Sequence, residues 1–167
     1  MGIDSSGQVD LYFGFVWQNP TEYLAVLKAE SDLVLKGTGD AEAQSTFFFG
    51  GHAYADPHAE LVLSTLSGGF PFHGAKTDIP TVYAHADSGL GGVPVKSHRD
   101  FSGIYHVTFD SQLEVDAFDW AFFIVHFWAV YDVHHGKVTL DFSSSNNSIM
   151  CPSVQMDFLT PPPVIAP

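Results

Sequence analysis

The sequence has very little positive charge and almost no cysteine. Six Lys and Arg residues stand against 19 Asp and Glu in 167 residues, which gives a formal net charge of −13. Nucleic acids and anionic membranes are bound through clusters of Lys and Arg, so we expect neither as a partner. Cys151 is the single cysteine, and it cannot form a disulfide within the chain. Folding must therefore depend on the hydrophobic core.

Long apolar runs and a secretory leader are also missing. No apolar stretch reaches the roughly 18 residues that a membrane-spanning helix needs. The first ten residues, MGIDSSGQVD, have neither the basic segment nor the apolar segment of a signal peptide. We therefore expect no transmembrane segment, and a protein that is cytoplasmic or released without a signal peptide.

Short runs with the composition of β-strands fill most of the chain, and turn residues separate them. Residues 9–17, VDLYFGFVW, alternate so that Val9, Leu11, Phe13, Phe15 and Trp17 share one face. Residues 19–30 fit a helix as well as a strand, because Asn19-Pro20 is a good helix start. The pattern predicts a single all-β domain over 1–167, with at most one short helix. Its architecture is an antiparallel two-sheet sandwich, and a closed β-barrel is the alternative.

The region around 67–103 differs from the rest of the chain. It holds seven of the 15 glycines, three prolines and half of the basic residues, namely Lys76, Lys96 and Arg99. Glycine and proline favour turns and loops, so we predict a long loop region here. Its basic side chains could receive an anionic group or could simply be solvated.

Residues 120–135, WAFFIVHFWAVYDVHH, form the most apolar stretch of the sequence. We interpret Val133–Lys137 as a hairpin turn, which would place Val133 opposite Val138 and Tyr131 opposite Leu140. Such pairing makes the odd-numbered side chains the core face, namely Phe123, Val125, Phe127, Tyr131 and Val133.

The even-numbered face of the same stretch is nearly as apolar. It carries Trp120, Phe122, Ile124, His126, Trp128 and Val130. Burial of each large side chain is worth about 1.5–3 kcal/mol, so this face should not stand in water. A second sheet, a homo-oligomer interface through the 120–130 strand or an apolar ligand could cover it. His126 is then either a core histidine or the polar contact of a pocket.

Two stretches place polar side chains at every second position. In HAYADPHAE (52–60), His52, Tyr54, Asp56, His58 and Glu60 would share one face of a strand. In VYAHAD (82–87), Tyr83, His85 and Asp87 alternate with alanines. Histidine and carboxylate bind divalent metals such as Zn, Fe, Cu, Ni or Ca. The predicted metal ligands are His52, Asp56, His58, Glu60 and His85, and the alternative is that both stretches are polar outer faces of edge strands.

Three functions remain open, and the sequence leaves undecided whether the protein is an enzyme. The first is a non-enzymatic, lectin-like or toxin-like β module that recognises neutral carbohydrate or a lipid headgroup through aromatic and short polar side chains. Exposed aromatic residues such as Trp17 and Tyr105 would support it. The alternatives are a metal-dependent enzyme with a His/carboxylate cluster beside an apolar cavity, and a self-assembling structural subunit. The predicted ligand contacts are Tyr54, Tyr83, Asp87, His126 and Trp128.

Overall fold

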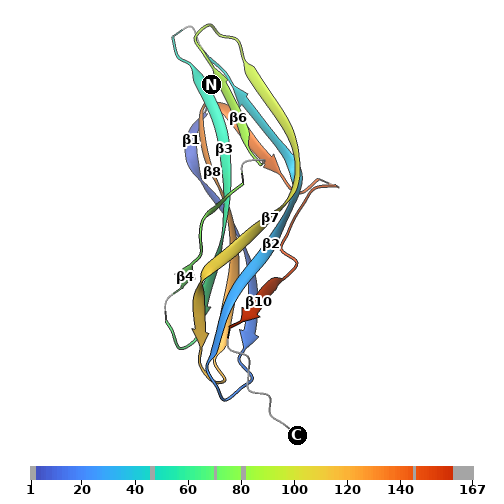
Figure 1. Ribbon diagram of the computed structural model, residues 1–167. Helices are drawn as coiled ribbons and strands as arrows, with labels where there is room; N and C mark the ends of the chain where they lie inside the picture. The colour runs from blue at the N-terminus through green and yellow to red at the C-terminus, as the bar shows by residue number, and fades with distance from the viewer. Residues whose placement is uncertain (1–2, 46–47, 70, 80–81, 145, 160–167) are drawn as a thin grey trace.

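The computed structural model describes residues 3–45, 48–69, 71–79, 82–144 and 146–159, and these residues form ten strands and no helix (Figure 1). The strands are β1 (Ile3–Gln18), β2 (Ala25–Ala43), β3 (Gly51–Thr65), β4 (Phe72–His73), β5 (Thr77–Asp78), β6 (Ala84–Ser88), β7 (Val95–Val115), β8 (Trp120–Asp141), β9 (Ser148–Met150) and β10 (Val154–Phe158). The predicted all-β class is confirmed.

The strands belong to one open, antiparallel sheet whose two halves face each other across the core. In one half, β8 lies between β1 and β3. In the other half, β2 pairs with β7 along one edge and with β9 and β10 along the other. The last residues of β8 cross between the halves, since 136–141 pair with 38–43 of β2. The sheet is open, so the alternative of a closed barrel is not supported.

The first turn shows why no helix forms after Pro20. The Asn19 side chain is fully buried, and its nitrogen donates to the backbone carbonyls of Tyr23, Val115 and Asp116. Its oxygen accepts from the backbone and the hydroxyl of Thr21, 3.1 and 2.9 Å away. Asparagine side chains commonly close such local turns in place of a helix start. The chain therefore reverses here, and strand β2 begins at Ala25.

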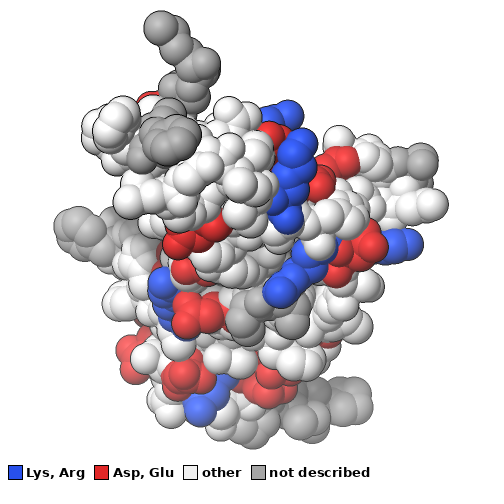
Figure 2. Space-filling view, turned by 90° about the horizontal axis from the view of Figure 1, so that it is seen from above, with Lys and Arg blue, Asp and Glu red and all other residues white. Residues whose placement is uncertain are grey.

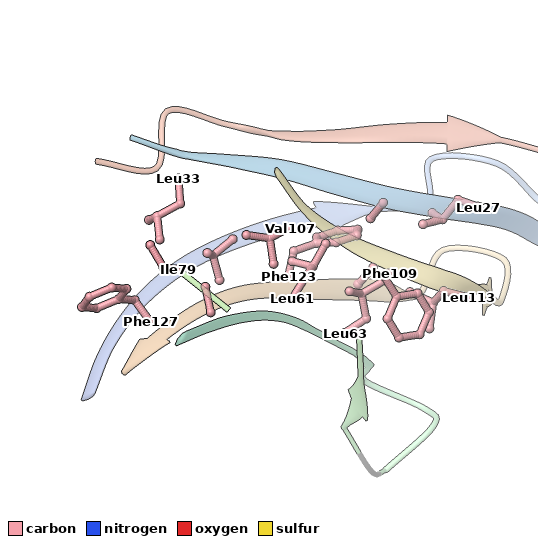
Figure 3. Close-up of a cluster of buried hydrophobic side chains, with 14 of the residues drawn as sticks. Leu27, Leu33, Leu61, Leu63, Ile79, Val107, Phe109, Leu113, Phe123 and Phe127 are labelled. Atoms are coloured by element: carbon pink, nitrogen blue, oxygen red, sulfur yellow. The ribbon is translucent and has the colours of Figure 1, made fainter. Parts of the chain in front are cut away.

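The core lies between the two halves of the sheet, and alternating residues fill it. Figure 3 shows side chains of β2 and β7, such as Leu27 and Val107, pointing toward those of β3 and β8. Phe123 is 1 % exposed, and the odd-numbered positions of β8 from Ala121 to Ala129 are all buried. The predicted core face of this stretch is therefore confirmed.

The predicted hairpin at Val133–Lys137 is wrong. β8 continues through these residues, and Val138 lies opposite Ala41 of β2. A β-bulge occurs here instead: Ile3 pairs with Gly136 and Ser5 with Val133, so two histidines oppose Asp4 alone. The extra residue shifts the inward-facing side chains from odd to even numbers, and Val138 and Leu140 pack inward beyond it. Because β8 continues through this segment, the same strand pairs with β1 and β3 in one half of the sheet and with β2 in the other.

The region 67–103 contains β4, β5, β6 and the first part of β7. Ile79 and Val82 from this region are fully buried in the core. Lys76 pairs with Asp78 at 3.6 Å and Lys96 with Glu42 at 3.1 Å. Figure 2 shows the same arrangement over one end of the molecule, where Lys and Arg side chains alternate with Asp and Glu and form no continuous basic patch.

The even-numbered face of 120–130 is the outer surface of its half of the sheet. Within the described chain no second sheet covers this face, so the first of the three covers that we considered is wrong. Trp120 is 40 % exposed, and the residues that follow at even positions are half-buried by neighbouring side chains of β1 and β3. The apolar and aromatic side chains of this face are therefore partly exposed to solvent.

Candidate functional site

The outer face of β1, β8 and β3 carries most of the residues that the sequence singles out. The register places Tyr12, His126 and Glu60 in one row across the three strands. Asp10, Trp128 and His58 form the next row. Because side chains on one face recur at every second residue, these two rows are adjacent on the same surface.

Three rings on this face stack on one another, and we call them the aromatic row: Tyr12, His126 and Trp128. The Tyr12 and His126 ring centroids are 4.5 Å apart with planes inclined by 14°. The His126 and Trp128 centroids are 4.7 Å apart at 26°. Tyr12 stands on the edge strand β1 and is 61 % exposed, so the row ends in an accessible aromatic surface.

Carboxylates hold both ring nitrogens of His126. Nε2 lies 2.7 Å from Oδ1 of Asp10, and Nδ1 lies 3.2 Å from Oε1 of Glu60, which also faces His73 at 3.2 Å. The hydrogen bond to His126 is the main cause that lowers the pKa of Asp10 below its ordinary value. His126 thus holds a carboxylate on each side in a fixed position, whereas the sequence predicted either a core histidine or the polar contact of a pocket.

His58 repeats this arrangement beside Trp128. Its Nδ1 lies 3.0 Å from Oδ1 of Asp78, and its Nε2 lies 3.4 Å from Oδ2 of Asp56. The His58 ring is 5.4 Å from the Trp128 ring, and its side chain is 7 % exposed. Asp56 and Asp78 remain 49 and 73 % exposed, so their other oxygens are open to a ligand.

The other predicted residues lie farther along the same half of the sheet. Asp87 and His134 are the neighbours of His52, and His85 and Asp132 are those of Tyr54. His52 Nε2 is 3.3 Å from Asp132 Oδ2, and the Tyr83 ring stacks near His85 at 5.6 Å. The predicted alternation is seen here, since Ala53, Ala55, Ala84 and Ala86 are buried beneath these side chains.

The five predicted metal ligands do not converge on one point. His52 and His58 are six residues apart on β3, which corresponds to roughly 20 Å along a strand. His58 and Glu60 face different partners, Asp56 and Asp78 in one case and His126 and His73 in the other. One ion could not be bound by the whole set in this arrangement.

Two aromatic residues expected on the surface face inward. Trp17 packs against the core and lies 5.3 Å from the ring of Phe158, and Tyr105 also packs against the core. Tyr12, which the sequence reasoning overlooked as a ligand contact, takes the exposed position. The alternation of residues 9–17 contained this signal, because Tyr12 lies on the face opposite Trp17.

A different group of metal-ligand type forms at the bulge. Asp4, His134 and His135 place one potential ligand atom each within 4.8 Å of one another. His134 Nδ1 is 3.0 Å from Asp4 Oδ1, and the backbone N–H of His135 donates to the same oxygen at 3.2 Å. The sequence alone could not reveal this group, because about 130 residues separate Asp4 from the two histidines.

An apolar groove of about 630 Å³ opens on the inner side of the sheet, next to the bulge. Its lining includes Val9 and Leu11 of β1, Phe127 of β8 and, beyond the bulge, Val138 and Leu140. Val9 is 63 % exposed, so the groove is accessible along β1. Its volume lies within the range of small-molecule sites.

Among the described residues, most ion pairs join a histidine to a carboxylate, which predicts a specific pH dependence. The hydrogen bond and charge of Asp40 raise the pKa of His98 above 6.5. His98 therefore stabilises the fold below about pH 6.5 and loses this effect as the pH rises through its folded pKa. We expect His98→Ala to lower the melting temperature more at pH 5.5 than at pH 8.5, as measured by differential scanning fluorimetry.

Asp141 is the control, because its pKa is shifted in the opposite direction to that of His98. Hydrogen bonds from Ser144 and Ser143 lower its pKa to about 2 from an ordinary value of 3.8. The contribution of Asp141 to the stability of the fold is present above pH 3.8 and is lost as the pH falls through about 2. Asp141→Ala should thus have equal effects at pH 5.5 and 8.5. Equal effects of His98→Ala at these two pH values would contradict the prediction.

Comparison with protein families, with characterised proteins and with solved structures found no match to this chain. The described residues also contain no helix that is long and apolar enough to span a membrane.

Proposed function

We propose that the protein is a non-enzymatic binding module that recognises neutral carbohydrate on the outer face of β1, β8 and β3. The observation that supports this most is the aromatic row, Tyr12–His126–Trp128, set between the carboxylates of Asp10 and Glu60. Sugars present apolar C–H faces and hydroxyl edges, so a site for them needs aromatic surface next to hydrogen-bonding groups.

The polar groups of this face are already oriented. His126 and His58 each hold carboxylates through both ring nitrogens, which fixes the side chains before a ligand arrives. A preorganised site loses less side-chain entropy on binding. Asp10, Asp56 and Asp78 keep 30–73 % of their side-chain surface exposed, so they can accept hydrogen bonds from hydroxyl groups.

The shape and charge of the face favour a neutral, extended ligand. The site lies on the open outer surface of long strands, where several sugar units could lie across neighbouring rows. The four carboxylates on this face, those of Asp10, Glu60, Asp56 and Asp78, would repel an anionic ligand. In the described part of the chain, the side chains that bond a histidine ring nitrogen are all carboxylates and none is a serine, threonine or cysteine, which favours binding over nucleophilic catalysis.

The test is a screen of neutral oligosaccharides, followed by calorimetry with the best ligand. We expect binding at millimolar affinity or tighter. Tyr12→Ala and Trp128→Ala should each weaken it by about tenfold or more, equivalent to about 1.4 kcal/mol, because each removes stacking surface. Tyr23→Ala is the matched control, since Tyr23 is 47 % exposed in the turn before β2 and should leave affinity unchanged.

Other outcomes would favour the alternatives. Binding to zwitterionic lipid vesicles without binding to oligosaccharides would indicate that the ligand is a lipid headgroup and not a sugar. If light scattering shows a dimer that Trp128→Ala converts to monomer, the outer face is a contact between copies of the chain. Either result would contradict the carbohydrate proposal.

A further inference from the structure

The bulge in β8 brings three metal-ligand side chains together. In a regular strand, consecutive residues face opposite sides, so His134 and His135 would point apart. Here both oppose Asp4, and their ring centroids are only 4.3 Å apart. The carboxylate of Asp4 is oriented by the His135 N–H and by Nδ1 of His134. The three side chains thus converge although they come from the two ends of the sequence.

The backbone at the bulge adopts a conformation that is costly for a residue other than glycine. His135 has a φ of 52°, in the left-handed region that favours glycine. Glycine follows at once, at position 136, where no positive φ is found. Residues in such conformations concentrate at functional sites, and at His135 this backbone geometry coincides with the convergence of the three side chains.

We propose that Asp4, His134 and His135 bind one divalent transition-metal ion of the Zn²⁺ type. Two imidazoles and a carboxylate are a common three-ligand set for such ions, and they leave one position for water or a further ligand. A tetrahedral ion with bonds near 2.1 Å needs ligand atoms about 3.4 Å apart. His134 and Asp4 are already at 3.0 Å, and the whole group lies within 4.8 Å, so a small rotation of side chains suffices. Calcium fits poorly, because it prefers six to eight oxygen ligands.

The site would join the first residues of β1 to β8. His52 of β3 lies beside it, with its ring 5.7 Å from that of His134 and its Nε2 bonded to Asp132. His134 and His126 are eight residues apart on β8, or roughly 26 Å along the strand. The metal site is therefore separate from the proposed carbohydrate site, and either proposal can fail without the other.

The test is Zn²⁺ binding to untagged, chelator-treated protein, measured by calorimetry and by elemental analysis after gel filtration. The wild type should bind one Zn²⁺ per chain and melt at a higher temperature with the ion than without it. His134→Ala and His135→Gly should each weaken binding at least tenfold. His106→Ala should not, and it is the matched control because His106 is an exposed histidine paired with Asp32 at 2.6 Å.

His135→Gly separates loss of a ligand from loss of the fold. Glycine adopts the positive φ without steric cost, so the metal-free variant should melt at a temperature equal to or higher than that of the metal-free wild type. Lower stability of metal-free His135→Gly would contradict the strain argument. The proposal is overturned if the wild type binds no stoichiometric Zn²⁺, if binding persists in both site variants, or if His106→Ala weakens it as much as they do.

Discussion

Replacing Phe123 by alanine should lower the free energy of unfolding by about 3–5 kcal/mol, the usual cost of truncating a buried phenylalanine. Phe123 is 1 % exposed at the centre of the core, where both halves of the sheet meet (Figure 3). Removal of its ring leaves a cavity that neighbouring strands cannot fill without moving. Urea denaturation measures the effect.

Phe122 is the matched control for this substitution. It is the same residue type on the same strand, but it faces the outer surface and is half-buried. Phe122→Ala should cost about 1 kcal/mol, because less apolar surface is removed from the folded state. Equal effects of the two substitutions would contradict the assignment of inner and outer faces in β8.

Replacing Gly136 by valine should destabilise the protein by about 3 kcal/mol. At Gly136 the strand leaves its neighbour β1 and meets β2, and a Cβ would collide with the backbone carbonyl oxygen of Glu42. The Cβ of Ala53 would be a second neighbour, at 3.2 Å. A backbone oxygen in a paired strand cannot move aside as a flexible side chain can. The pairing of β8 with β2 at this point must therefore distort.

Gly14→Val tests whether the cost at Gly136 is specific. Gly14 also lies in a strand, yet a Cβ there would have no neighbouring atom within 4 Å. The substitution should be neutral or slightly stabilising, since valine suits a strand better than glycine does. No loss of stability in Gly136→Val would contradict the crossing of β8 between the halves, and a large loss in Gly14→Val would show that the cost at Gly136 is not specific to the crossing.

Local alternation predicted those parts of the structure that depend on a single strand. The alanines that alternate with polar residues in 52–60 are buried at 53, 55 and 59, as the pattern required. The odd-numbered residues of 121–129 are buried for the same reason. Alternation depends only on the geometry of the extended chain, so it can be read without knowing the partner strand.

The parts that the sequence could not predict depend on distant partners. His-His-Gly-Lys at 134–137 has the composition of a turn, but pairing with β2, almost 100 residues away, extends the strand through it. The same bulge places Asp4 beside His134, and no local pattern connects these residues. The stacking of Tyr12 on His126 likewise depends on the register of β1 against β8, which the sequence does not reveal.

The proposed carbohydrate site can be tested most directly by following the three tryptophan indole N–H signals by NMR during titration with the best neutral oligosaccharide. Trp128 belongs to the aromatic row, whereas Trp17 packs inward against Phe158. We predict that the Trp128 signal shifts in a saturable way, that the Trp17 signal stays unchanged, and that Tyr12→Ala reduces the response. A saturable shift of Trp17 alone, or no shift of any indole signal at millimolar ligand, would contradict the proposal.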